Sequence, residues 1–360
     1  MVKESSMIDF QVHENQIALK QKLEYVLKTF NDLYSVTKKT TISYGSIMDD
    51  SVVIMPANEG EFFDRNEPEP KNICFSLWEG KEIPFLFHNS VNELIKKNTE
   101  TSSVVISADI LLSAFYFLSC WQEHTSNEED SMGRFPYKSS MIGKLGIAKI
   151  PVVNYYFDIL KKAIQEFHGN ESVISYRQQL GLKVGLTHDI DQCKTGWKEE
   201  NFRRLIDGKI ISGISKIISR PFNNDVWFNF SSIMEHEQKK SISSSFYFIA
   251  EKQKAGSYPN ADYMIESPEM NSRVNELISE GFEVGIHGSI GTGFDLEKFR
   301  AEIQKFQSEE LGGRFHYLMM RIPETWKIIE ESELTYDSTL GFAEMIGFRN
   351  GFCYPFQPYD

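Results

Sequence analysis

Two aspartates and a histidine follow an apolar run in residues 185–192, GLTHDIDQ. Carboxylates and imidazoles are side chains that bind divalent metals and transfer protons during hydrolysis. Asp189 and Asp191 are two residues apart, so on a strand both side chains point to one face, and Ile190 points to the other. A polar turn after a strand would contain the same residue types. The stretch predicts a site only if partners elsewhere in the sequence join it.

Two further histidines lie in predicted strands of the second half of the chain. His287 is in FEVGIHG, residues 282–288, and His316 is in GRFHYLMMRI, residues 313–322. A divalent metal that activates water needs a few such ligands and an open coordination position. The alternative is a core or loop position for His287, and a hydrogen-bonded core position for His316 inside an apolar strand.

The elements that must position these residues alternate from residue 183 onwards. The pattern predicts strands and then helices in turn, with strands at 183–189, 243–250, 282–288, 313–322 and 334–339 and helices at 226–240, 268–280, 296–308 and 323–332. Such alternation favours parallel pairing, in which functional residues gather at the carboxyl ends of strands. The polar residues at or near those ends are Asp189, Asp191, His287, His316 and Asp337.

The first part of the chain also alternates strands with helices. Apolar runs predict strands at 51–56, 72–78 and 82–87, and helical spacing predicts helices at 109–123 and 152–167. We therefore expect an α/β protein with a smaller α/β domain at 1–175 and a second domain at 176–360.

Composition excludes several classes of function. The net charge of -13 argues against a nucleic-acid partner, because phosphate binding needs clustered Lys and Arg. The polar start lacks a secretory signal, and no apolar stretch approaches the ~20 residues of a membrane span. The four cysteines, Cys74, Cys120, Cys193 and Cys353, are scattered and form no CxxC pair. This pattern suits reduced thiols, so we expect a cytoplasmic protein.

The ordered set of motifs resembles the polysaccharide deacetylase superfamily (NodB-type, carbohydrate esterase 4). The resemblance rests on THDID, SSSFYFIAEKQ and ELISEGFEVGIHGS, and is closest to a branch whose later elements here read HYLMM, PETW, YDSTLGF and GFRNGFCYPF. It covers about residues 180–360, and the stretches DILLSAFYFLSCWQE, GRFP and PVVNYY resemble the segment that precedes the deacetylase domain in that branch. It implies a distorted (β/α) barrel of the NodB type that removes N-acetyl groups from an amino sugar in a surface polysaccharide.

The resemblance assigns roles to single residues. Asp189 matches the family's general base, Asp191 its aspartate metal ligand, and His287 the first histidine of its HxxxH metal motif. The second histidine of that motif falls at Gly291, so the usual triad is incomplete. We predict His316 as the substitute ligand of a divalent metal, Zn²⁺ or else Co²⁺ or Ni²⁺.

Two further family motifs are altered. The Arg-x-Pro-Tyr motif, whose arginine orients the catalytic aspartate, fits 314–317 best and makes Arg314 and Tyr317 catalytic candidates. Residues 321–323, Arg-Ile-Pro, are the competing alignment. The family's acid histidine should lie near the carboxyl end, but no histidine follows His316. The chain also stops at QPYD, where further strands should close the barrel, so it is truncated relative to its relatives or this branch ends differently.

Rival functions remain open from the sequence. A carbohydrate-binding or scaffold protein could retain the deacetylase fold without the metal, and a metal-dependent amidohydrolase could act on an amide that is not a sugar. Aromatic residues near strand ends would suit stacking on sugar rings, although core packing is the alternative for each; they are Trp197, Phe294, Tyr317, Trp326 and Phe342.

Overall fold

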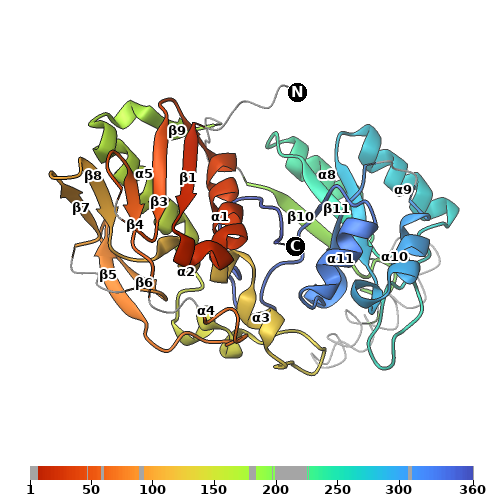
Figure 1. The fold of residues 1–360 in the computed structure, drawn as a ribbon. Helices are drawn as coiled ribbons and strands as arrows, with labels where there is room; N and C mark the ends of the chain where they lie inside the picture. The colour runs from red at the N-terminus through yellow and green to blue at the C-terminus, as the bar shows by residue number, and fades with distance from the viewer. Residues whose placement is uncertain are drawn as a thin grey trace. The chain divides into compact units, whose positions relative to one another are not determined.

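The computed structural model of the chain describes residues 7–46, 48–57, 61–88, 93–177, 184–196, 198, 225, 227–306 and 310–359. It is a mixed α/β structure that divides into two compact units (Figure 1). The first unit comprises Met1–Asp130, Phe135–Leu182 and Gly341–Asp360, and the second comprises Ser131–Arg134 and Lys183–Leu340. The expected boundary after residue 175 lies close to the change of unit after Leu182, a position outside the described residues.

The first unit contains a five-stranded sheet in the order β1-β3-β4-β8-β7. Its first four strands pair in parallel, and β7 pairs antiparallel to β8. The strands are β1 (Ile8–Val12), β3 (Thr40–Tyr44), β4 (Val52–Ile54), β7 (Ile95–Asn98) and β8 (Ser103–Ile106). Two antiparallel pairs accompany this sheet, β2 (Tyr34–Val36) with β9 (Ile174–Tyr176), and β5 (Cys74–Trp78) with β6 (Lys81–Phe85). The strands predicted at 51–56, 72–78 and 82–87 are confirmed as β4, β5 and β6.

The helices of the first unit are α1 (Lys20–Leu33), α2 (Ile110–Leu118), α3 (Trp121–Thr125), α4 (Met141–Lys144) and α5 (Val152–His168), with short 3₁₀ turns at Glu14–Leu19, Tyr137–Ser139 and Glu171–Val173. The helix predicted at 152–167 is confirmed as α5. The helix predicted at 109–123 is divided, because Cys120 adopts a left-handed backbone conformation with φ of 50° and ends α2. Among the described residues, no helix is both long and apolar enough to cross a lipid bilayer.

The carboxyl-terminal segment Gly341–Asp360 belongs to the first unit, whereas the sequence placed it in the second domain. Phe342 and Phe352 are buried in the first unit's core, and the peptide N–H of Val153 donates to the carbonyl of Gly351. A buried ion pair joins Arg349 to Glu123 at 2.5 Å. Burial of these side chains explains why the segment returns to the first unit after the second is complete.

The second unit contains five parallel strands in the order β10-β11-β12-β13-β14. The strands are β10 (Leu186–Ile190), β11 (Ser244–Phe248), β12 (Glu283–Gly288), β13 (Gly312–Phe315) and β14 (Tyr336–Asp337). Between them lie α8 (Phe230–Gln238), α9 (Pro268–Ser279), α10 (Leu296–Ile303) and α11 (Glu324–Glu331), with 3₁₀ turns at Thr292–Phe294 and His316–Leu318. The predicted alternation and parallel pairing are confirmed in this unit.

Local signals account for the best-predicted helix of this unit. The Ser267 hydroxyl accepts a hydrogen bond from the peptide N–H of Met270, and Pro268 occupies the first helical position of α9. Gly281 follows the helix with φ of 83°, a conformation that favours glycine. The strand predicted at 313–322 is shorter than expected, because the chain turns at His316–Leu318.

Over the described residues, the sheet of the second unit has β10 and β14 as its two edges and does not close on itself. The core on this sheet forms two small clusters, one around Phe246 and Phe248 and one around Ile286 and Phe315. The distorted (β/α) barrel of the NodB type stays a prediction. The carboxyl ends of β10, β12 and β13 carry the candidate site.

Candidate metal centre

The end of β10 presents its polar residues on two faces. Asp189 and Asp191 line a pocket of about 270 Å³, as their spacing predicts. His188 lies elsewhere: its Nε2 is 2.7 Å from a carboxylate oxygen of buried Glu237, and its ring lies against Phe246 with the ring centroids 4.6 Å apart. His188 is therefore a packed and hydrogen-bonded residue rather than part of the site.

His287 lies near the end of β12, and its side chain is buried. Its Nδ1 is 2.8 Å from the carbonyl oxygen of Arg314. Because a carbonyl can only accept, Nδ1 carries the proton and Nε2 presents a lone pair. A carbonyl that fixes the ring in this way is the usual support of a metal-binding histidine.

His316 is the first residue after β13 and is also buried. Its Nε2 donates to the carbonyl oxygen of Pro259 at 3.2 Å, so its Nδ1 presents a lone pair. Burial lowers the pKa of His316 below its ordinary value of 6.5, although the nearby Asp191 carboxylate opposes this shift. The ring is therefore held in the neutral form that binds metals.

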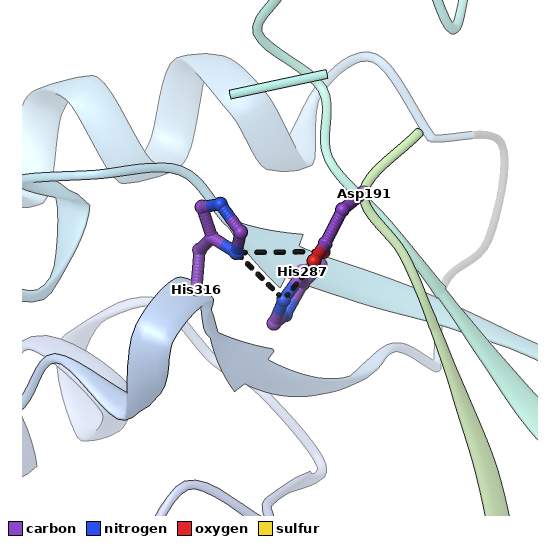
Figure 2. A group of neighbouring side chains, drawn as sticks. All are labelled: Asp191, His287 and His316. Atoms are coloured by element: carbon purple, nitrogen blue, oxygen red, sulfur yellow. Dashed lines mark hydrogen bonds and ion pairs between the residues drawn. The ribbon is translucent and has the colours of Figure 1, made fainter. Parts of the chain in front are cut away.

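Asp191, His287 and His316 converge on one point (Figure 2). Asp191 Oδ1 lies 3.3 Å from His287 Nε2 and 3.4 Å from His316 Nδ1, and the two nitrogens lie 3.1 Å apart. Asp191 Oδ1 is buried and has no hydrogen-bond partner among the described residues. Three acceptor atoms thus face one another, an arrangement that a cation between them would stabilise.

The separations of these three atoms fit a small divalent metal. Zinc binds nitrogen and carboxylate oxygen at about 2.0–2.2 Å in a tetrahedral arrangement, which separates neighbouring ligand atoms by about 3.3–3.6 Å. The observed 3.1, 3.3 and 3.4 Å are close to that spacing. Two imidazoles and one carboxylate suit zinc, cobalt or nickel better than magnesium or calcium, which prefer oxygen ligands.

Arg314 fixes Asp189 at the edge of the same group. Its guanidinium Nη1 donates to Asp189 Oδ1 at 3.0 Å and to the hydroxyl of Thr187 at 3.1 Å. Asp189 Oδ2 then lies 4.0 Å from His287 Nε2. The carboxylate is thereby oriented toward the three converging atoms without being one of them.

The geometry distinguishes the two arginine alignments. Arg314 contacts the candidate base, whereas the guanidinium of Arg321 lies over the ring of Phe294, 5.0 Å from its centroid. At the position predicted for a second motif histidine, Gly291 has φ of 92°, a conformation that favours glycine. The third atom of the converging group comes from His316, directly after β13.

Tyr317 also lines the pocket, next to His316. The ring centroids of His316 and Tyr317 are 4.0 Å apart, and the Tyr317 backbone has φ of 58°. The side chain of Arg134 donates to its carbonyl at 2.7 Å, which supports the turn. Burial, and secondarily the charge of Asp191, raises the pKa of the Tyr317 phenol above 10.0.

The residues that line the pocket are Asp189, Asp191, Gln192, Trp227, Pro259, Asn260, His316 and Tyr317. Sequence reasoning did not identify Trp227, Pro259 or Asn260 as part of this wall. Of the aromatic candidates, Tyr317 lines the pocket, Phe342 belongs to the first unit, and Phe294 lies under Arg321. Trp326, on α11, is not among the residues that line the pocket, and Trp197 lies outside the described residues. Trp227 and Asn260 carry no motif or periodicity that could have identified them.

Comparison with known proteins gives one match. A family of unknown function, DUF7033, matches residues 11–169, which belong to the first unit except for Ser131–Arg134 and span less than half of the chain. No curated protein and no solved structure shows a significant match to the chain.

Proposed function

We propose that the second unit is a metal-dependent hydrolase that removes N-acetyl groups from an amino sugar of a surface polysaccharide or its precursor. The observation that carries the proposal is the convergence of Asp191, His287 and His316, whose three potential ligand atoms lie within 4.8 Å of one another. Asp189 lies beside them as a carboxylate that Arg314 orients. Three protein ligands with a neighbouring general base are typical of catalytic zinc sites.

Asp191, His287 and His316 would hold the metal, which supplies Lewis-acid chemistry by polarising a carbonyl oxygen and making water more acidic. Asp189 would remove the proton from the attacking water. The water oxygen bonds to the carbonyl carbon of the acetamide, the C–N bond breaks, and acetate and a free amine result.

The departing nitrogen needs a proton in this reaction. The ionisable groups that line the pocket besides the two ligands are Asp189, once it has been protonated, and the phenol of Tyr317. Both can return a proton to the amine without a histidine at the carboxyl end of the chain. Arg314 acts through Asp189, because its guanidinium contacts that carboxylate.

The carbohydrate part of the proposal rests on the sequence resemblance and on the pocket wall. Trp227 and Tyr317 offer apolar ring faces, and Gln192 lies in the same wall with an amide group of the kind that binds hydroxyls and N-acetyl groups. Trp227 is held close to Gly196, where an added methyl group would lie 2.5 Å from the indole. We place the reaction in the cytoplasm, with which four unpaired thiols are compatible.

Acetate release tests the proposal. Purified protein is stripped with a chelator, reloaded with Zn²⁺, Co²⁺ or Ni²⁺, and incubated with N-acetylated sugars, oligosaccharides, sugar nucleotides and, as a matched set, N-acetylated amines that are not sugars. We expect metal-dependent acetate release from the sugars. Release from the other amides alone would indicate a general amidohydrolase. Bound metal without release from any compound would count against the deacetylase activity, and absence of bound metal would reject the metal centre.

A further inference from the structure

The connection between β11 and α9 crosses close to all three ligand-bearing segments. Its residues Pro259–Asp262 form hydrogen bonds to each of them, and Tyr263 extends the contact to the end of β10. These residues, Pro-Asn-Ala-Asp-Tyr, are here named the 259–263 segment. The contacts come from four different residues of the segment, so each contact can be considered separately.

The amino-terminal half of the segment supports the two histidines. The carbonyl of Pro259 accepts from Nε2 of His316 and so fixes which ring nitrogen faces Asp191. Asn260 is buried, and its amide oxygen accepts from the peptide N–H of Ile290, three residues after His287. One short stretch of chain thereby contacts the His316 ring directly and the loop that follows His287.

The carboxyl-terminal half of the segment supports the aspartates. Asp262 accepts three hydrogen bonds, from the peptide N–H groups of Cys193 and Lys194 at 2.9 and 2.8 Å and from the Thr195 hydroxyl at 2.8 Å. The fully buried Tyr263 donates its phenolic proton to the carbonyl of Ile190 at 2.5 Å. Asp191 lies between these two anchored positions.

The Asp191 side chain needs this support more than the histidines do. His287 and His316 are buried, whereas 46% of the Asp191 side chain is exposed, and Asp191 follows β10 rather than lying within it. Sheet pairing ends at Ile190, so the position of Asp191 depends on what holds the loop after it. Within the described residues, the Asp262 carboxylate is the group that bonds to three consecutive residues of that loop.

We propose that Asp262 is a positioning residue that presets Asp191 for metal binding, as part of the 259–263 segment that aligns all three ligands. The inference rests on the metal centre of the proposed function. It assigns no contact between Asp262 and the metal or substrate. The role is preorganisation: the ligand atoms are placed before the metal arrives, so binding does not have to order the loop after β10.

Metal affinity tests the role without a substrate. Zn²⁺ and Co²⁺ are titrated against a chromophoric chelator with the full chain, and the visible absorption of bound Co²⁺ reports the coordination. Asp262→Ala should weaken binding about 10–100-fold, the usual effect of losing a residue that supports a ligand, and should change the Co²⁺ spectrum. Ser267→Ala is the matched control, because it removes a helix cap in the same connection but touches no ligand-bearing segment.

Two milder variants keep the test independent of folding. Asp262→Asn retains one acceptor oxygen but turns an amide N–H₂ toward a donor, so it should have a smaller effect than alanine. Thr195→Val removes one of the three donors and should have the smallest effect. This graded order in affinity, with the spectrum changing in parallel, supports positioning of Asp191.

Three outcomes decide the inference. Wild-type affinity and an unchanged spectrum in folded Asp262→Ala would overturn it while leaving the metal centre intact. An equal loss in Ser267→Ala would also overturn it, because the effect would then be general destabilisation. A graded loss of metal in a protein that releases no acetate would support the inference and reject the deacetylase activity.

Discussion

Two aspartates at comparable places in the two units have opposite surroundings. Asp109 follows β8 in the first unit, and Asp191 follows β10 in the second, each beyond the carboxyl end of a parallel strand. Asp109 is fully buried and accepts from the Tyr44 hydroxyl at 2.5 Å, from the peptide N–H of Leu112 at 3.0 Å and from that of Ala57 at 3.2 Å.

The Asp191 carboxylate faces acceptors instead of donors. Its Oδ1 has two unprotonated imidazole nitrogens as neighbours and no hydrogen-bond partner among the described residues. The chain itself satisfies Asp109, which caps α2 and supports the fold. No such donors surround Asp191 Oδ1 among the described residues, and the proposed cation would take their place. The groups that surround a carboxylate, more than its place in the topology, distinguish a structural residue from a candidate ligand.

The largest expected effect is on catalysis and concerns the second unit alone. Asp189→Asn removes the proposed general base and should reduce the rate of deacetylation by ~10²–10⁴-fold. Metal content should stay near one ion per chain, because Asp189 is not among the three ligand atoms. Rates and metal content of purified variants measure both effects. Tyr44→Phe, which changes the first unit, is the control and should keep full activity; wild-type rates in Asp189→Asn would reject the role.

The next effect is specific to the first unit and depends on pH. Burial raises the pKa of Asp109 from 3.8 to about 6. Because the folded pKa exceeds the unfolded one, the stabilising contribution is complete below about pH 4 and is lost as pH rises through about 6. The shift corresponds to about 3 kcal/mol. Asp109→Asn lacks this titration, so the wild type should lose up to that much stability relative to the variant between pH 4 and pH 7.

Urea unfolding measures this difference if it is followed by hydrogen exchange in α2, because a chain of two units need not unfold in one step. Parallel pH curves for wild type and Asp109→Asn would contradict the prediction. Exchange in β10–β12 should not respond to the substitution. A response there would show that the two units do not unfold separately.

Metal should stabilise the second unit only. At about 100 times the dissociation constant, a bound ion adds about 2.7 kcal/mol to the free energy of unfolding. Hydrogen exchange in β10, β12 and β13 should slow by the corresponding factor, while exchange in β3 and β4 stays unchanged. Asp191→Asn, His287→Ala and His316→Ala should each remove this protection. Full protection in His316→Ala would show that two protein ligands suffice and that His316 is a core residue.

The sequence predicted the site better than the parts that hold it. Asp191, His287 and His316 could be placed together because the carboxyl ends of parallel strands meet at one edge of a sheet. The ion pair between Arg314 and Asp189 was predicted from the resemblance to the Arg-x-Pro-Tyr motif rather than from the spacing of the residues. Asp262 lies in a connection without periodicity, and its contacts with 193–195 join residues almost 70 positions apart. Contacts over such sequence separations cannot be predicted from local sequence patterns.

Backbone conformation and long-range packing explain the remaining differences. The strand predicted at 313–322 ends at Phe315, because Tyr317 and Leu318 adopt positive φ angles that their residue types do not signal. The helix predicted at 109–123 divides at Cys120 for the same reason. The return of Gly341–Asp360 to the first unit depends on contacts such as Arg349 with Glu123, 226 positions away, which local sequence patterns cannot register.

The smallest expected effect is a gain of stability from a substitution at Asp191, although most substitutions lower the free energy of unfolding. Without metal, Asp191 Oδ1 faces the lone pairs of His287 Nε2 and His316 Nδ1, because the other nitrogen of each ring donates to a backbone carbonyl. In Asp191→Asn the amide N–H₂ can donate to one of those nitrogens, and a net hydrogen bond contributes about 0.5–1.5 kcal/mol. The metal-free variant should therefore be more stable than the wild type by about this amount. Asp189→Asn, two residues away at the end of β10, is the matched control, and it should be less stable by about 0.2–1 kcal/mol because it loses the ion pair with Arg314. Hydrogen exchange in β10–β12 with excess chelator measures both changes. Equal losses of stability in the two variants would mean that Asp191 is satisfied without a cation, as Asp109 is, and the contrast between the two units would disappear.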